Sequence, residues 1–171
     1  MEKLSKETFH DSIKGHFAGE LYNAMVDNPK VVVITADLGF GLWDKIRKDF
    51  PDRFYNVGAA ELTAVTVAVG MSQEGLIPFV YSITPFLLFR GAEAIRNYVN
   101  NEKVNLKLIT SGRSDDYSKT DGFSHYAGDD KLILQAFPNI QAFWPLTKSD
   151  MKYTVDWCVR SPQSIYVNLK R

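Results

Sequence analysis

The sequence predicts an α/β fold with three layers, αβα, around a mostly parallel sheet of about six strands. Short runs rich in β-branched and aromatic residues alternate with segments of helical length, the order that gives a parallel sheet with helices on both faces. The first run, VVVIT at residues 31–35, is apolar without alternation, which is typical of a strand covered on both sides. A chain of 171 residues that is 45% hydrophobic has room for one domain with a sizeable core.

The first element is an amphipathic helix. Apolar residues recur at every fourth position from Phe9 to Met25, which places them on one face of a helix that ends near Asn28. We expect a single domain, residues 1–171, in which residues 1–28 form this N-terminal helix and residues 29–171 form the core.

The remaining elements follow in alternation. The predicted strands are residues 31–35, 53–57, 77–82, 105–111, 140–144 and 164–169. The predicted helices between them are residues 43–50, 60–71, 84–100, 130–137 and 148–160. Small and apolar residues leave the helix at 60–71 almost without a polar face, so we expect it to be buried. Residues 112–128 contain little that could enter a core, and a loop of this length is more often functional or disordered than incidental.

Composition excludes several classes of protein. Lys and Arg together number 20, as do Asp and Glu, and this zero net charge without a basic stripe argues against nucleic acid as a partner. The opening MEKLSKET is charged where a signal peptide needs an apolar region, and the apolar runs fall far short of the ~20 residues of a membrane span. A single cysteine, Cys158, excludes an internal disulfide and fits a reducing compartment. We therefore expect a cytoplasmic protein without a membrane partner.

Common catalytic and metal-binding patterns are missing from the sequence. The glycine-containing loop at residues 37–41 follows a strand but contains neither GxGxxG nor GxxxxGK[ST]. His10, His16 and His125 are too scattered for a metal site with ligand spacing, so we expect no metal ligands in this chain. No GxSxG elbow marks a nucleophilic serine. The reactive group is therefore expected to come from a cofactor.

Polar candidates follow the strands, where ligands of open α/β sheets bind. They are Asp37 after the first strand, Glu61 after the second, and Asp121 and His125 after the fourth. Glu61 lies in an otherwise apolar stretch, and because a buried charge costs several kcal/mol, such a carboxyl group either raises its pKa or finds a partner. The alternative is a carboxylate at a helix N-terminus that interacts with the helix dipole, worth about 0.3–1 kcal/mol. Periodicity alone favours this alternative.

Residues 50–61, FPDRFYNVGAAE, resemble the FPDRF-x-NVG-x-AE signature that opens the pyrimidine-binding domain of transketolases, which use thiamine diphosphate. Further segments are similar to that family in the same order: VITADL at 33–38, IPF at 77–79, EAIRN at 93–97, DGFSH at 121–125 and FPNIQAFWP at 137–145. The resemblance covers nearly the whole chain from about residue 30, and it implies the thiamine diphosphate-binding fold.

The resemblance also implies roles for residues around the cofactor. Glu61 matches the glutamic acid that hydrogen-bonds the aminopyrimidine ring nitrogen and favours its imino tautomer, a role that an apolar site supports by raising the pKa of the acid. Two aromatic positions that hold the pyrimidine match Ile83 and Phe86 in an ungapped alignment, or Phe86 and Phe89 in a shifted one. Asp37 matches an aspartate near the cofactor at the subunit boundary. The alternative for the phenylalanines is that they pack in the core and do not contact the pyrimidine. The alternative for Asp37 is that it caps a helix N-terminus.

Asp121 and His125 match residues that contact the sugar donor in transketolases, with a solvated loop as the alternative. The sequence departs from the family after Glu61, where LTA stands at residues 62–64, and after Asp121, so the donor and acceptor stay open. The sequence has no GDG followed by a distant Asn, the family's pattern for the Mg²⁺ that binds the diphosphate. The resemblance therefore implies that thiamine diphosphate is shared with a partner subunit and that Mg²⁺ is bound through that partner.

These observations lead to three functional hypotheses. The first is a subunit of a split transketolase-like enzyme that transfers a two-carbon ketol unit and is active only with a diphosphate-binding partner, as an α2β2 heterotetramer. The second is a subunit of a thiamine diphosphate-dependent 2-keto acid decarboxylase or carboligase. The third is a non-catalytic regulatory or binding subunit that retains the fold. The expected substrates are a phosphorylated or nucleotide-linked sugar or a keto acid.

Overall fold

The computed structural model describes residues 9–171 and contains one six-stranded sheet with the order β2-β1-β3-β4-β6-β5. All five strand pairings are parallel, so the predicted sheet is confirmed. The strands are β1 (Val31–Thr35), β2 (Phe54–Asn56), β3 (Ile77–Ile83), β4 (Lys107–Ser111), β5 (Gln141–Phe143) and β6 (Ile165–Leu169). The octapeptide at residues 1–8, on which the signal-peptide argument rests, lies outside the described residues.

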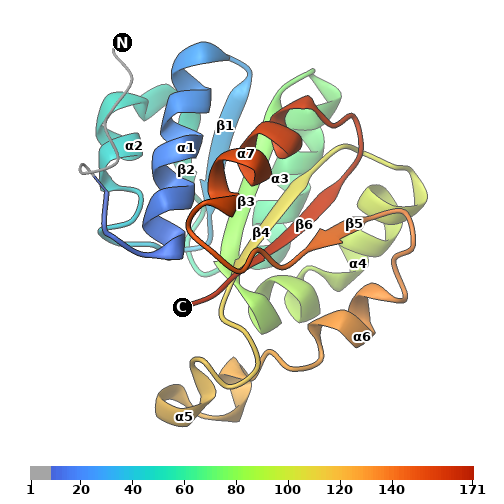
Figure 1. The fold of residues 1–171 in the computed structure, drawn as a ribbon. Helices are drawn as coiled ribbons and strands as arrows, with labels where there is room; N and C mark the ends of the chain where they lie inside the picture. The colour runs from blue at the N-terminus through green and yellow to red at the C-terminus, as the bar shows by residue number, and fades with distance from the viewer. Residues whose placement is uncertain (1–8) are drawn as a thin grey trace.

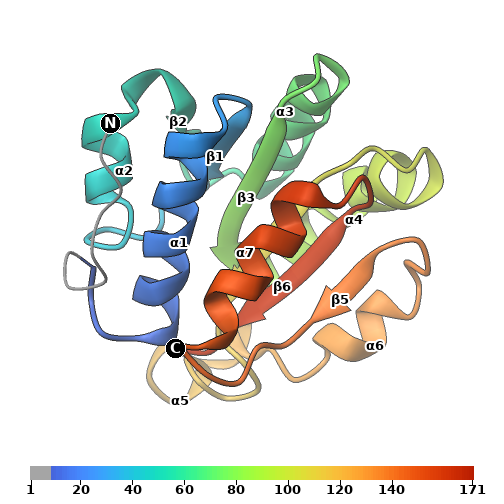
Figure 2. The same ribbon diagram turned by 45° about the horizontal axis from the view of Figure 1, so that its top comes forward.

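Helices cover both faces of the sheet. The α-helices are α1 (Ile13–Asp27), α2 (Asp44–Asp49), α3 (Glu61–Gln73), α4 (Ala92–Ala94), α5 (Ser118–Asp121), α6 (Asp130–Leu134) and α7 (Asp150–Arg160). Short 3₁₀ turns η2 (Pro51–Arg53) and η5 (Phe123–His125) and π-helical segments η3 (Phe86–Arg90) and η4 (Ile95–Asn101) complete the chain. Figure 1 shows α1 and α7 side by side on one face, with α3 and α4 on the other. Figure 2, turned by 45°, shows the same layers.

Alternating side chains of the strands enter two apolar clusters. Val31 and Val33 of β1 pack under α1 and α7, whereas Ile34 packs on the opposite face with α3. Every residue of β1, β4 and β6 is buried, which explains why β1 is apolar without a period of two. Lys107, Thr110 and Ser111 of β4 and Asn168 of β6 are buried polar residues. The core therefore extends through both layers and holds the strand ends in a fixed register.

Helix α1 begins later than the periodicity predicts. The Oγ of Ser12 accepts a hydrogen bond from the amide of Gly15 (3.1 Å) and caps the helix, so Phe9 precedes it. The ring of Phe9 nevertheless packs against that of Tyr22, with centroids 6.0 Å apart. The apolar period therefore continues past the N-cap because the preceding segment also contacts the core.

Two further expectations about helices are corrected. Helix α3 is buried on one face only, and Leu62, Thr63 and Thr66 on the other face are exposed. The stretch predicted as one helix at 84–100 is broken into η3, α4 and η4, with Gly91 between the first two. Both differences have the same origin. The apolar content of a segment indicates that it contacts the core, but it does not show which face is buried or whether the backbone is a regular α-helix.

The segment at residues 112–128 is not without structure. It contains α5 and η5, and the amide of Ala127 donates to the carbonyl of Ser114 (2.8 Å), closing the base of the segment as an isolated antiparallel bridge. Figure 1 shows α5 projecting beyond the carboxyl ends of the strands. The segment is thus a tethered extension next to the edge at which ligands of such sheets bind.

Candidate functional site

The carboxyl edge of the sheet brings several predicted residues to one side of the molecule. Because all strands run in parallel, the segments that follow β1, β2, β3 and β4 start from the same edge. These segments contain Asp37, Glu61, Phe86 and His125 respectively. The fold therefore gathers candidates that are up to 88 positions apart in the sequence, from residue 37 to residue 125.

Glu61 is the first residue of α3 and is only 2% exposed. The hydroxyl of Ser82, near the end of β3, donates to its Oε1 at 3.1 Å. The guanidinium of Arg90 donates to its Oε2 at 2.9 Å. Both interpretations of the sequence hold for the position of Glu61: it lies at a helix N-terminus, where a negative charge is favoured, and it is also buried and paired.

Arg90 connects Glu61 to an aromatic ring. The central carbon of its guanidinium lies 4.3 Å from the ring centroid of Phe86, within the range of a cation–π contact. On another side of Phe86, the imidazole of His125 makes an edge contact with centroids 4.8 Å apart and planes at 68°. Glu61, Arg90, Phe86 and His125 thus form one contiguous set of side chains, which we call the edge cluster.

The backbone after β3 positions the edge cluster. Phe86 and Arg90 are the first and last residues of η3, so both lie on one short helical turn. Gly91 follows, and a β-carbon there would lie 2.6 Å from the carbonyl oxygen of Leu87 in the same turn and 3.2 Å from Cγ2 of Val65 on α3. The absence of a side chain at Gly91 therefore lets this turn approach the helix that begins with Glu61. π-helical turns of this kind are frequent at functional sites.

The segment that contains His125 is anchored by a buried polar cluster. The carboxylate of Asp130 accepts hydrogen bonds from the indole of Trp144 (2.7 Å), the hydroxyl of Tyr166 (3.1 Å) and the amide of Asn168 (2.8 Å). Burial and the neighbouring Asp130 raise the pKa of Tyr166. These hydrogen bonds hold the chain directly after residues 112–128, where it returns to the core. The position of His125 therefore does not depend on apolar packing alone.

Asp37 lies beside the next strand end rather than within the edge cluster. Its backbone has φ of +54°, an uncommon value for a residue other than glycine. The side chain of Asn56 accepts from the amides of Asp37 and Gly58 and donates to the carboxylate of Asp37, each at 3.0 Å. Asn56 therefore joins the turns after β1 and β2, and strained backbone of this type is concentrated at functional sites.

The other predicted residues lie around the edge cluster. Ile83 is the last residue of β3 and is partly buried, whereas Phe89 is 56% exposed. Asp121 ends α5 and is exposed, and its carboxylate accepts a hydrogen bond from Thr120 (3.0 Å). Of the predicted aromatic residues, Phe86 is therefore the one that contacts both Arg90 and His125.

Sequence reasoning missed three residues that hold this site together. Arg90 follows Phe86 by four positions, a spacing that places both on one helical face and could have indicated the contact. Ser82 and Asn56 each lie at a strand end, but their partners are 21 and 19 positions away in sequence. No local pattern marks those pairings.

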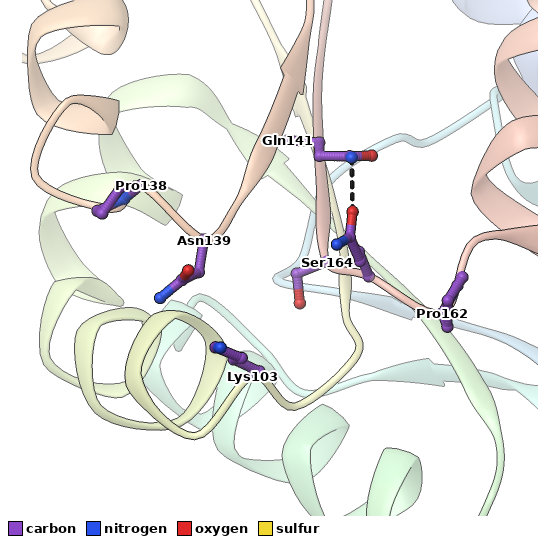
Figure 3. A pocket seen from close by; sticks show the side chains of 7 residues that line it. Lys103, Pro138, Asn139, Gln141, Pro162 and Ser164 are labelled. Carbon is purple, nitrogen blue, oxygen red and sulfur yellow. Dashed lines mark hydrogen bonds between the residues drawn. The ribbon is translucent and has the colours of Figure 1, made fainter.

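A pocket of about 400 Å³ lies elsewhere, at the amino ends of β5 and β6. Figure 3 shows its lining, which includes Lys103, Asn139 and Ser164, and the hydrogen bond between Gln141 and Gln163. This lining contains no carboxylate, histidine or aromatic ring.

Within residues 9–171 no group of three or more His, Cys, Asp or Glu could hold a metal ion. In the same residues, no helix has the length and apolar character that crossing a bilayer requires.

Comparison with known proteins finds relatives of this chain. Residues 13–171 match the family described as transketolase, pyrimidine binding domain. The chain is 34% identical over 167 residues to 1-deoxy-D-xylulose-5-phosphate synthase of Clostridium perfringens and 30% identical over 122 residues to one subunit of apulose-4-phosphate transketolase of Actinobacillus succinogenes. These alignments cover 90% and 71% of this chain but 26% and 39% of the two relatives. The chain thus spans well under half the length of these curated relatives.

Solved structures show the same fold. A split-gene transketolase described as an inactive beta4 tetramer has a TM-score of 0.82 and 30% identity, over 94% of this chain and 51% of that chain. Transketolase from Leishmania mexicana also has a TM-score of 0.82, with 17% identity, over 98% of this chain and 27% of that chain. The α/β fold that the sequence motifs imply is thereby confirmed.

Proposed function

The chain belongs to the transketolase pyrimidine-binding domain family, and from this membership we propose that it is the pyrimidine-side subunit of a split thiamine diphosphate-dependent enzyme. In this proposal the complex transfers a two-carbon ketol unit, and the chain alone is inactive. The second, diphosphate-binding side of the site comes from a partner subunit, in an α2β2 heterotetramer. Two relatives, one described as a transketolase subunit and the other as a split-gene transketolase, support a divided enzyme of this kind.

The observation that supports this function best is the buried carboxyl group of Glu61 beside the half-exposed turn η3. A site for an aminopyrimidine needs an acid at the ring nitrogen and an apolar surface for the ring face. Glu61 and Phe86 offer this pair of groups on adjacent elements, linked through Arg90. The residues present therefore fit the pyrimidine half of the cofactor.

Bound thiamine diphosphate would supply the nucleophilic carbon and the electron sink for cleavage of a carbon–carbon bond next to a carbonyl. Glu61 would hold a proton at the pyrimidine nitrogen, and Phe86 would contact the ring face. His125 and Asp121 would donate or accept hydrogen bonds at hydroxyls of the donor substrate. Asp37 would lie at the boundary with the partner. Ile83 and Phe89 remain candidates for further ring contacts.

Exposed apolar side chains near the carboxyl edge support completion of the site by another chain. Phe123 is 85% exposed and stacks on Tyr126 with centroids 6.0 Å apart. Phe89, at 56%, and Leu62, at 43%, lie on η3 and at the start of α3. Apolar groups of this size that cluster around a site are typical of contact surfaces. We assign Mg²⁺ to the partner because this sequence lacks the family's GDG pattern with a downstream Asn.

Calorimetry with and without the partner tests the proposed function. The partner would be a coexpressed chain with the GDG pattern and a downstream Asn. We expect thiamine diphosphate with Mg²⁺ to bind the purified chain weakly and the assembled complex tightly. Tight binding of both by this chain alone would contradict the divided site. Assays with ketose phosphates as donors would then test the transfer reaction directly.

A second candidate is the decarboxylation or carboligation of 2-keto acids by the same divided site. It stays open because identity to the synthase named above, 34%, is as high as identity to the transketolase subunit, 30%. Both reactions would use the same pyrimidine side, so the difference lies with the substrate. Supplying the assembled complex with ketose phosphates or with 2-keto acids, and measuring released CO₂, separates the two.

A further inference from the structure

The guanidinium of Arg90 lies between the two groups proposed to receive the pyrimidine. One of its nitrogens donates to Oε2 of Glu61 at 2.9 Å, and its central carbon lies 4.3 Å from the ring centroid of Phe86. The Arg90 side chain is 53% exposed, whereas that of Glu61 is 2% exposed. A solvent-accessible cation thus covers a buried anion and an aromatic ring at the same time.

A guanidinium and an aminopyrimidine present similar chemistry to these neighbours. Both are planar, both place nitrogen atoms at the edge that faces a carboxyl group, and both can lie against an aromatic ring. The guanidinium donates to a carboxylate, whereas the pyrimidine ring nitrogen would accept from a protonated carboxyl group. Arg90 therefore occupies the two positions, at Glu61 and at Phe86, that the proposed function assigns to the pyrimidine, but its hydrogen bond to Glu61 runs in the opposite direction. The two groups compete for one place.

We propose that Arg90 is a displaceable counter-ion that fills the pyrimidine position of the free subunit and leaves Glu61 when the cofactor enters. This inference rests on the proposed function, because it concerns the same position. In the free chain Arg90 neutralises a carboxylate that would otherwise be buried without an ionic partner. A long side chain that is already half exposed returns to water easily, so cofactor binding exchanges the partners of Glu61: the guanidinium leaves the carboxylate, and Glu61 takes up a proton from solvent that it shares with the pyrimidine nitrogen.

The exchange has a consequence for assembly. Any free energy that the Glu61–Arg90 pair contributes to the free chain opposes pyrimidine binding by that chain. Contacts that only the partner supplies must then compensate for it. Arg90 therefore lowers the affinity of the unassembled subunit for the cofactor and makes binding depend on the complex.

The first experiment is a double-mutant cycle on the free chain with Arg90→Met, Glu61→Gln and both together, measured by thermal unfolding. We expect Arg90→Met to lower the Tm by several degrees when Glu61 is present and by much less in the Glu61→Gln background. Arg90→Lys keeps the positive charge and is the second variant to measure if Arg90→Met does not fold. Its Tm should be close to that of the wild type. Additive effects in the cycle would overturn the counter-ion role.

Arg96→Met is the matched control. Arg96 is exposed on the following helical segment η4 and donates to the side chain of Asn97 (3.1 Å) rather than to Glu61. The same substitution there removes a cation of the same size from the same region. We expect it to leave the Tm close to that of the wild type in either Glu61 background.

The second experiment titrates thiamine, up to millimolar concentration, into the free wild-type chain and the Arg90→Met, Arg90→Lys and Arg96→Met chains, observed by NMR. We expect Kd to fall on the order of tenfold for Arg90→Met and to stay unchanged for Arg96→Met. Equal or weaker binding by Arg90→Met would overturn the displacement while leaving the proposed function standing. The same titration is repeated with the assembled complex. If thiamine bound neither to any free chain nor to the complex, the proposed function would fail and the displacement with it.

Discussion

The hydroxyl of Ser82 donates a 3.1 Å hydrogen bond to Oε1 of Glu61, and this bond joins the end of β3 to the start of α3. Both side chains are buried, at 0% and 2% exposure. The carboxyl group is therefore aimed by the sheet itself and not by a flexible loop. A group held in this way keeps one orientation whether or not Arg90 contacts its other oxygen.

Replacing Ser82 with Ala should loosen this orientation. The substitution removes one donor from a buried carboxylate, and we expect the free energy of unfolding to fall by about 1.5–3 kcal/mol. Chemical denaturation of the purified chain measures this change. Ser124→Ala, at an exposed position of η5, is the matched control and should unfold as the wild type does. Equal stability of the two variants would mean that the Ser82 bond does not stabilise the folded chain.

Asn56 should hold the turns after β1 and β2 together. Asn56→Ala removes three hydrogen bonds at an exposed position, and we expect a loss of about 0.5–1.5 kcal/mol in the free energy of unfolding. Asn56→Asp keeps an acceptor for the two amides but places a second negative charge beside Asp37. Because salt screens like charges, its stability should rise with ionic strength more than that of the wild type. A salt response equal to that of Asn56→Ala would contradict this geometry.

The fold was largely predictable because its central strands are buried on both faces. Runs such as residues 31–35 have no polar alternation, and all six predicted strands are present in the structure, with bounds that differ by up to two residues. The details of the helices were less predictable. The absence of a polar face on α3 suggested full burial, but Leu62 and Thr66 are exposed. The π-helical segment η3 ends at Gly91, and the close approach of Gly91 to Val65 becomes evident only in the tertiary structure.

The site was predictable where one residue stood out against its surroundings. Glu61 is a charge within an apolar stretch, and its burial follows from that pattern. Its partners could not be predicted from the residues alone. Ser82 and Arg90 lie 21 and 29 positions further along the chain and reach Glu61 only because β3 lies against α3 and the chain then turns back over it.

Cys158 should be unreactive in the folded chain. It is buried in α7, and burial raises the pKa of its thiol to about 12. Since the thiolate is the nucleophile, an aromatic disulfide reagent at about pH 8 should modify the folded chain very slowly. The same reagent should react with one thiol per chain in denaturing urea. Fast stoichiometric modification without urea would show that α7 opens readily.

Lys107 gives the stability a defined dependence on pH. Burial lowers the pKa of its ammonium group to about 8 from 10.5, although the group donates to Asn105 and to the carbonyls of Ser161 and Gln163. Between these values the unfolded chain binds more protons than the folded chain, so this group increases stability as the pH rises.

The test compares the wild type with Lys107→Met. The free energy of unfolding of the wild type, relative to that of the variant, should increase from about pH 7.5 to about pH 9.5. Most other titrating groups are present in both chains and cancel in the difference. Burial raises the pKa of the Cys158 thiol to about 12, although the charge of Lys107 lowers it, so this thiol titrates above this range. A difference that stays constant or shrinks over this range would mean that the folded chain does not depress the pKa of Lys107.

The most direct test of the proposed function is the activity of the assembled complex with Glu61→Gln in this chain. Glutamine keeps the size and the hydrogen-bonding ability of the side chain but cannot hold the acid proton, so we predict a fall in kcat of about 10²–10⁴-fold with assembly intact. Glu74→Gln, the same substitution at the exposed C-cap of α3, is the control and should leave kcat unchanged. Turnover by the Glu61→Gln complex at the rate of the Glu74→Gln complex would contradict the account.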